Sequence, residues 1–250
     1  MNTYVIKLQT RKNLGDPAFV DHLINSWCNY SDESLRPERF DLGEPVRRKI
    51  HEEGVDTVIK TWLENQMPVM LKRITKPKFD VGINWRANIG LDKSPFPFGC
   101  RVWLALSAGD TKAIALFKWL VNMFDPGFGL LSTYDDVKIK HFISINTRIG
   151  TVQEYAGLEV SDTLPGLFWC TYFGPTVVER LGVFPQQPLS VYEQEKFNDG
   201  LFLRLFESSA DIGLPESTTS TELIYQAIGK QKFFDLSQAK ARLSLEYSTK

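Results

Sequence analysis

A strict alternation of apolar and polar residues at positions 79–85 is the feature that most constrains the fold. The segment reads FDVGINW, so Phe79, Val81, Ile83 and Trp85 share one side of an extended chain. Successive side chains of a strand point to opposite faces, and this pattern therefore predicts a strand buried on one face only. Such a strand requires a sheet with a packed layer on one side, which excludes an all-helical fold.

Further segments have the same extended character, and two of them are joined by a recognisable turn. Strands are predicted at residues 4–9, 69–74, 101–107, 137–145, 167–173, 191–197 and 201–206. The last two flank Asn198-Asp199-Gly200, a turn sequence typical of a β-hairpin. We therefore expect strands that pair through hairpins.

Helical periodicity marks most of the remaining apolar segments. The clearest helix follows Asp110, where Ala113, Phe117 and Leu120 lie on one broad face, and it ends at Asp125-Pro126-Gly127. Further helices are predicted to start at Asp16-Pro17 and at Glu44-Pro45 (divided by Gly54), to cover residues 175–181 and 223–228, and to follow Asp235. Residues 31–42 and 208–221 are predicted loops.

The order of these elements favours one α+β domain over residues 1–250. Hairpins alternate with helices, whereas a parallel sheet requires a repeated strand–helix–strand unit. We predict a mostly antiparallel twisted sheet with flanking helices. A division into two domains near residues 125–136 has no linker to support it.

Composition and charge exclude several classes of function. The formal net charge is -1, whereas broad nucleic-acid binding requires clustered lysine and arginine. The first segment, MNTYVIKLQTRK, has no apolar run long enough for a signal peptide, and no stretch approaches the ~20 apolar residues of a membrane span. These features predict a cytoplasmic protein that binds neither nucleic acid directly nor a membrane.

Residue types suited to catalysis are present but scattered. His22, His51 and His141 have no partners at metal-ligand spacing, and Cys170 has no neighbouring histidine or cation to lower the pKa of its thiol. The Gly-x-Ser-x-Gly pattern of a nucleophile elbow does not occur. We therefore expect no enzyme, no cofactor and no metal.

One weak pattern leaves an enzymatic alternative open. Asp136, Val137 and Lys138 match the core of restriction-type nuclease sites, and Asp125 supplies a second carboxylate for a divalent metal. Such a triplet also arises by chance in a chain with 30 acidic residues, and a charged turn that enters a strand explains it equally. The alternative is a metal-dependent hydrolase or nuclease-like enzyme that uses Asp125, Asp136 and Lys138.

Two acidic turns are candidate partner-binding sites. One contains Asp135 and Asp136, and the other contains Glu193, Glu195 and Asp199. Glu193 and Glu195 share one face of their predicted strand because side chains alternate along it. Such carboxylates either form a solvated edge that discourages strand aggregation or contact a basic protein partner.

The segment LPGLFWCTYFGPTVVERLG, residues 164–182, carries a family resemblance. The residues that carry it are Leu164-Pro165-Gly166, Trp169, Tyr172-Phe173-Gly174-Pro175 and Leu181-Gly182. They resemble a signature of bacterial immunity proteins from polymorphic-toxin and type VI secretion systems, and the chain most resembles the immunity protein 52 family. The following segment DGLFLRLFES, residues 199–208, resembles the next strand of that family.

The resemblance implies a protein that binds and neutralises a cognate secreted toxin in the producing cell. For this family the implied toxin is a restriction-endonuclease-like nuclease. The resemblance implies no catalytic residues, and it favours the aromatic segment as a signature of the fold rather than as the interface. An adaptor or chaperone module is the remaining alternative.

Overall fold

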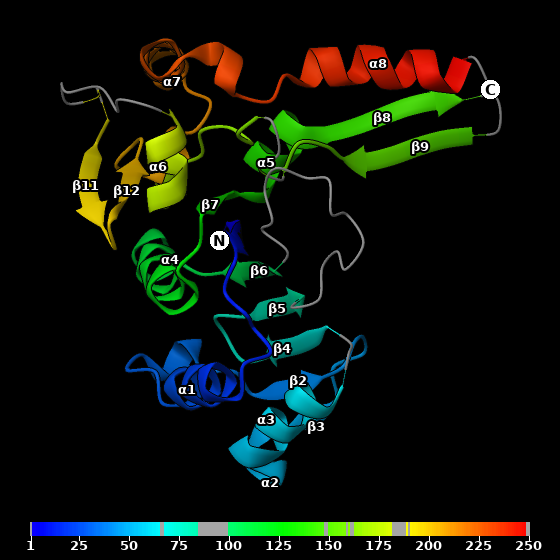
Figure 1. Ribbon diagram of the computed structural model, residues 1–250, viewed down its shortest axis with the longest axis vertical. Coiled ribbons are helices and arrows are strands. Elements are labelled where there is room, and N and C mark those ends of the chain that lie inside the picture. The colour runs from blue at the N-terminus through cyan, green and yellow to red at the C-terminus, as the bar shows by residue number, and fades with distance from the viewer. Residues whose placement is uncertain are drawn as a thin grey trace.

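A long antiparallel sheet organises the chain (Figure 1). The computed structural model describes residues 2–65, 68–84, 100–147, 150–158, 160, 163–181, 189 and 191–248. Ten described strands form this sheet, and every neighbouring pair is antiparallel. Their order is β11 (Glu193–Phe197), β12 (Gly200–Arg204), β10 (Cys170–Phe173), β7 (Phe128–Thr133), β1 (Thr3–Thr10), β6 (Cys100–Ser107), β5 (Phe79–Asn84), β4 (Val69–Arg73), β2 (Arg39–Asp41) and β3 (Arg48–Lys49). The predicted α+β class is confirmed.

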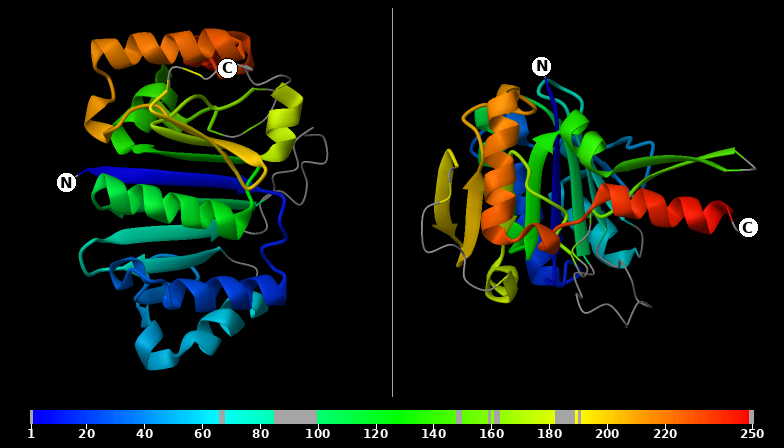
Figure 2. Two further views of the ribbon diagram at one scale, coloured as in Figure 1. Left: turned by 90° about the vertical axis from the view of Figure 1, so that its left-hand side faces the viewer. Right: turned by 90° about the horizontal axis from the view of Figure 1, so that it is seen from above.

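One face of the sheet is covered by α1 (Pro17–Cys28), α3 (Val55–Glu64) and α4 (Asp110–Phe124), as Figure 2 shows for α1 and α4. Tyr4, Ile6 and Leu8 alternate along β1 and point into this layer. Trp27 of α1 and Phe117 of α4 are fully buried there. The apolar stripes predicted for α1 and α4 therefore form the larger part of the core.

The opposite face is covered over only part of its width. α5 (Tyr134–His141), α6 (Pro175–Leu181) and α7 (Pro215–Ile228) pack there with residues of β7, β10 and β12. β8 (Phe142–Thr147) and β9 (Gly150–Tyr155) leave this side as a hairpin, and α8 (Leu236–Ser248) runs beside it (Figures 1 and 2). Among the described residues, no helix covers the same side of β6, β5, β4, β2 and β3, and we call this region, with Lys7 of β1, the open sheet face.

The aromatic segment recognised in the sequence is a packed corner of the core. All residues of β10 are buried, and burial raises the pKa of the Cys170 thiol. The Trp169 ring stacks on Tyr4 at 5.7 Å between centroids, and its indole N–H donates to the Phe206 carbonyl at 3.0 Å. These contacts make the segment a structural element of the fold.

The turn at Gly174 requires a residue without a side chain. The Gly174 N–H donates to the Gly127 carbonyl at 2.8 Å, which brings the two backbones together. A Cβ at Gly174 would lie 2.4 Å from the Pro126 carbonyl oxygen. Gly174 also caps α6, because its carbonyl accepts from the N–H groups of Val177 and Val178.

The prediction of a strand from Val137 to Ile145 is wrong over its first half, where the chain forms helix α5 instead. The Thr133 hydroxyl accepts from the Asp136 N–H at 3.3 Å and caps this helix. Acidic residues occupy the first turn of α5 and basic residues the last, which suits the helix dipole. The Thr133 cap and the order of the charges favour a helix more than the alternation of apolar and polar residues favours a strand. The strand therefore begins only at Phe142.

Other parts of the prediction also differ from the structure: β7 and β9 were not predicted as strands, and β2 lies in the predicted loop at 31–42. The helix expected at Glu44-Pro45 begins only at Ile50, as α2 (Ile50–Glu53), because Arg48 and Lys49 pair with β2 as β3. Gly54, at a φ of 85°, separates α2 from α3, which confirms the predicted division. The loop expected at 208–221 becomes helical from Pro215, which occupies the first turn of α7.

A pair of matched glycine substitutions tests the close approach at Gly174. Gly174 and Gly109 both cap helices, but nothing lies within 4 Å of a Cβ at Gly109. We expect Gly174→Ala to lower the free energy of unfolding by about 1–3 kcal/mol more than Gly109→Ala, because only Gly174→Ala forces backbone atoms apart. Urea denaturation of both variants measures this, and equal losses would contradict the packing at Gly174.

Candidate functional site

Helix α5 presents an unusual set of side chains to solvent. Val137 and His141 lie one turn apart and are buried against the core. This orientation leaves Tyr134 and Ile139 at the surface with exposed fractions of 43% and 76%. Because these apolar groups stabilise little in the free protein, α5 is a candidate contact element.

An apolar hollow lies between α5 and the open sheet face. Its volume is about 100 Å³, and it is lined by Val5, Lys7, Trp103, Leu130, Tyr134, Val137, Tyr155 and Leu158. Trp103, Tyr134 and Tyr155 come from β6, α5 and β9, and we call this group with its cavity the aromatic hollow. Three of the four exposed aromatic side chains among the described residues belong to it; the fourth is Tyr192.

Hydrogen bonding and ring contacts fix the rim of the aromatic hollow. The Tyr155 hydroxyl donates to the Tyr134 hydroxyl at 3.0 Å, which links β9 to α5. The Phe142 ring meets Tyr155 edge to face at 5.3 Å between centroids. The rim is therefore ordered before any partner binds, which reduces the entropy lost on binding.

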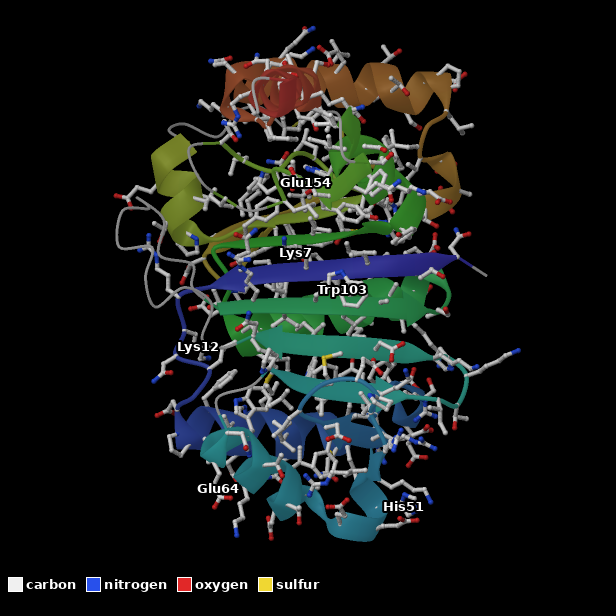
Figure 3. All side chains as sticks on the ribbon, turned by 90° about the vertical axis from the view of Figure 1, so that its right-hand side faces the viewer. Lys7, Lys12, His51, Glu64, Trp103 and Glu154 are labelled. Carbon is white, nitrogen blue, oxygen red and sulfur yellow. The ribbon has the colours of Figure 1, made fainter. Side chains whose placement is uncertain are left out.

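Basic side chains border the aromatic hollow. Lys7 is directly opposite Trp103 in the β1–β6 register, and Figure 3 shows both on the open sheet face. The Lys138 ammonium lies 5.4 Å from the centre of the Phe142 ring. The hollow thus combines aromatic surface, which is enriched in protein interfaces, with lysine ammonium groups nearby.

A wider cleft of about 790 Å³ lies on the other side of α5. Its lining includes Tyr134 and Ile139 of α5 and Thr218, Glu222 and Tyr225 of α7. Because Tyr134 lines both the cleft and the aromatic hollow, α5 forms a ridge between them.

The predicted acidic pair on α5 is divided by the fold. Asp136 is buried, accepts from the Ser132 hydroxyl at 2.6 Å, and forms an ion pair with Lys140 at 2.9 Å. The Lys140 ammonium also donates to the Leu167 carbonyl at 2.9 Å, so Asp136 holds α5 against the core. Asp135 is exposed and lines the cleft, where a contact with a partner remains a prediction.

The second predicted acidic group lies on the β11–β12 hairpin and is largely paired within the chain. Lys118 of α4 contacts Glu193 at 2.8 Å and Glu195 at 2.7 Å. Burial opposes the charge on Lys118, but these two hydrogen bonds raise its pKa above the usual value. Asp199 is exposed and pairs with Lys196 at 3.1 Å. A partner-binding role for Glu193, Glu195 and Asp199 remains a prediction.

The residues of the enzymatic alternative lie on different elements. Asp125 ends α4 in a left-handed conformation, and Asp136 is buried as described, whereas Lys138 is at the surface of α5. No hydrogen bond or ion pair among the described residues joins these three side chains. In the part of the chain that the structure describes, no three His, Cys, Asp or Glu side chains are grouped to hold a metal.

The aromatic hollow was not predicted from the sequence. The segment 101–107 is apolar on both faces and reads as a central strand buried on both sides. Only the pairing of β6 with β1 and β5 places Trp103 on the uncovered side. The sequence feature that could have indicated the hollow is a large tryptophan on a strand whose neighbouring strands carry polar residues.

Buried His141 lies behind α5 between two phenylalanine rings. Phe168 and Phe234 stack on it at 5.6 and 5.4 Å, and its Nδ1–H donates to the Ala156 carbonyl at 2.7 Å. Burial lowers the pKa of His141 to about 4, and the nearby ammonium groups of Lys140 and Lys7 act in the same direction, whereas the Ala156 carbonyl and Asp136 oppose them. His141 therefore folds as a neutral side chain.

Comparisons with known proteins identify a shared fold. No family model matches the chain, and no curated protein matches it. Among solved structures, the chain is similar to the T6SS protein PA0821 of Pseudomonas aeruginosa, with a TM-score of 0.54 and 11% identity over 93% of this chain and 74% of that one. At this identity the likeness establishes a common fold. No described helix is both long enough and apolar enough to cross a membrane.

The buried neutral state of His141 makes stability depend on pH. Between pH 6.5 and about 4 the unfolded chain binds a proton at this residue and the folded protein does not. The free energy of unfolding should therefore decrease as the pH is lowered through that window, by up to about 1.4 kcal/mol per pH unit. Urea denaturation at several pH values gives the slope of the free energy of unfolding against pH. This slope should be smaller for His141→Gln than for the native protein. His22→Gln, the same substitution at an exposed histidine, is the control. An unchanged slope in His141→Gln would contradict the assignment.

Proposed function

We propose that this protein is an immunity protein that binds and neutralises a cognate secreted toxin in the cytoplasm of the producing cell. The observation that carries the proposal is the aromatic hollow. Tryptophan and tyrosine side chains that surround an apolar pocket supply much of the binding energy in protein interfaces. Trp103, Tyr134 and Tyr155 provide such a group on an otherwise well-packed chain.

The secretion system is suggested by two independent likenesses. The fold is similar to that of a T6SS protein over nearly the whole chain. Residues 164–182 resemble a signature of immunity proteins, and residues 164–174 of this segment are buried in the core. A conserved fold with a separate contact surface suits a family whose members face different toxins. The expected toxin is a nuclease effector, as the resemblance implies.

The candidate contact surface extends over several elements of the fold. Stable protein complexes bury about 800 Å² on each partner. The aromatic hollow shares Trp103 with the open sheet face and Tyr134 with the ridge of α5, so one partner can contact all three. A toxin bound there loses access to its substrate, or to the surface through which it assembles.

Co-expression with the toxin encoded by the neighbouring gene tests this function. We expect growth to be restored and a stable complex of the two proteins to be recovered by affinity purification. A tagged, unrelated protein of similar size is the control. Absence of both rescue and complex would overturn the proposal.

Substitution of Trp103 tests whether the aromatic hollow is the contact. We expect Trp103→Ala to raise the Kd for the toxin at least about 30-fold, since removal of a central aromatic contact costs about 2 kcal/mol or more. Calorimetry with an inactive toxin variant measures this. Tyr192→Ala removes the exposed aromatic group that lies outside the hollow and should leave the Kd nearly unchanged. Equal effects of the two substitutions would contradict the assignment.

A further inference from the structure

The outer edge of β9 pairs with no other strand among the described residues. β9 pairs with β8 along one side only, from Tyr155 opposite Phe142 to Gly150 opposite Thr147. Helix α8 packs along β8, and Figure 1 shows it on the side of β8 that lies away from β9. Every residue of β9 whose burial is described is exposed. This edge is therefore accessible to another strand.

The register of the hairpin shows which backbone groups of β9 point outward. The Ala156 N–H donates to the His141 carbonyl at 2.9 Å, directly beside the β8–β9 ladder. Hydrogen-bonded and non-hydrogen-bonded pairs alternate along antiparallel strands, so Glu154, two residues away, bonds to β8. Tyr155 and Gln153 therefore direct their N–H and C=O groups away from β8. No described residue forms a hydrogen bond with these outward backbone groups.

The ends of the ten-stranded sheet are protected against an added strand, whereas the edge of β9 is not. One end is β11, which carries Glu193, Glu195 and Lys196, and the other is β3, which is two residues long. Charged residues and short edge strands both discourage pairing with a further chain. β9 is six residues long, and Glu154 is its only charged residue. A two-stranded hairpin is also marginally stable by itself, so a third strand would stabilise β8 and β9.

The outer edge of β9 adjoins the aromatic hollow. The Tyr155 side chain lines the hollow and bonds to Tyr134, while the Tyr155 backbone faces outward. Ile143 packs against α8, whereas its neighbour Phe142 meets the Tyr155 ring on the opposite face of the hairpin. A residue of an added strand that lies opposite Tyr155 has its side chain on this same face, about 5 Å away. That side chain therefore faces the hollow.

We propose that an extended segment of the toxin adds to β9 as a third strand and places an apolar side chain in the aromatic hollow. This inference rests on the proposed function and specifies the element through which the toxin binds. In strand addition, backbone hydrogen bonds supply affinity, and pockets for alternate side chains supply specificity. Glu154 shares the other face of the hairpin with Ile143, so the toxin strand alternates between apolar residues toward the hollow and polar residues beside Glu154.

A second copy of this chain fits the edge less well than the toxin does. Two β9 strands that pair antiparallel about Gln153 would place Thr151 of one copy opposite Tyr155 of the other. Threonine would bring a short polar side chain to an apolar cavity of about 100 Å³. A shift by one residue pair toward Tyr155 would place the two Glu154 side chains opposite each other, and like charges so placed destabilise a sheet. A different chain with an apolar residue at this point avoids both problems.

Paired substitutions at Gln153 test whether the backbone of β9 is the contact. Gln153→Pro removes an outward N–H and no bond to β8, and proline is tolerated on an edge strand in this orientation. We expect it to raise the Kd for an inactive variant of the neighbouring gene's toxin at least about tenfold, because strand addition makes β9 a central strand. Gln153→Ala is the matched control, since it keeps the N–H, and should change the Kd little. Calorimetry measures both values.

Hydrogen exchange of the native protein, followed residue by residue by NMR, provides a measurement that needs no substitution. In the free protein the outward amides of Gln153 and Tyr155 should exchange rapidly, whereas the Glu154 amide, which bonds to β8, should exchange slowly. We expect the bound toxin to slow exchange at Gln153 and Tyr155 at least about tenfold, because both amides then bond to the toxin strand.

The outcomes distinguish this inference from the proposed function. If the native protein binds the toxin but Gln153→Pro and Gln153→Ala have equal Kd values, or Gln153 and Tyr155 gain no protection, strand addition is overturned and the function stands. Failure of the native protein to bind the toxin would remove the function and this inference together. Self-association that Gln153→Pro abolishes without an effect on toxin binding would assign the edge to a second copy and overturn the inference. If thermal unfolding shows that Gln153→Pro does not fold, hydrogen exchange decides.

Discussion

The pairing of β1 with both β6 and β7 is the interaction on which the rest of the structure depends. β1 lies at the middle of the sheet and joins β6-β5-β4-β2-β3 on one side to β7-β10-β12-β11 on the other. Its alternating residues serve both layers, since Ile6 and Leu8 enter the core under α1 and α4, whereas Val5 enters the core under α5 and α7. Lys7 is the point at which the second layer ends and the open sheet face begins.

A polar cluster fastens this central strand to distant parts of the chain. The Tyr4 hydroxyl bonds to Asp110, at the start of α4, and to the Ser209 hydroxyl at 2.8 Å. Asp110 also accepts from the Ser209 N–H at 2.9 Å and from the Ser208 hydroxyl at 3.1 Å. Burial opposes ionisation of Asp110, but these hydrogen bonds keep its pKa below the usual value. A carboxylate at a helix N-terminus is also stabilised by the helix dipole.

Local sequence signals were sufficient for elements with one dominant pattern. The helices after Asp16 and Asp110, the hairpin at Asn198-Asp199 and the strand from Phe79 follow from capping, periodicity and turn chemistry. Conflicting signals caused the error at α5, where the Thr133 cap favours a helix and the alternation of apolar and polar residues favours a strand. The site could not be predicted, because Trp103, Tyr134 and Tyr155 meet only through long-range strand pairing. Sequence alone also could not show that Lys118 engages the acidic hairpin.

The central place of β1 has a consequence for the order in which this protein becomes active during synthesis. Thr3–Thr10 must wait for Cys100–Ser107 and then Phe128–Thr133 before both of its edges are paired. Pairings of such long sequence separation form slowly, and unpaired strands are prone to aggregate meanwhile. Tyr155 emerges from the ribosome later still. A nascent chain therefore offers no complete candidate contact surface until well over half of it has been translated. Under the proposed function, a cell protected by this protein needs finished molecules in reserve.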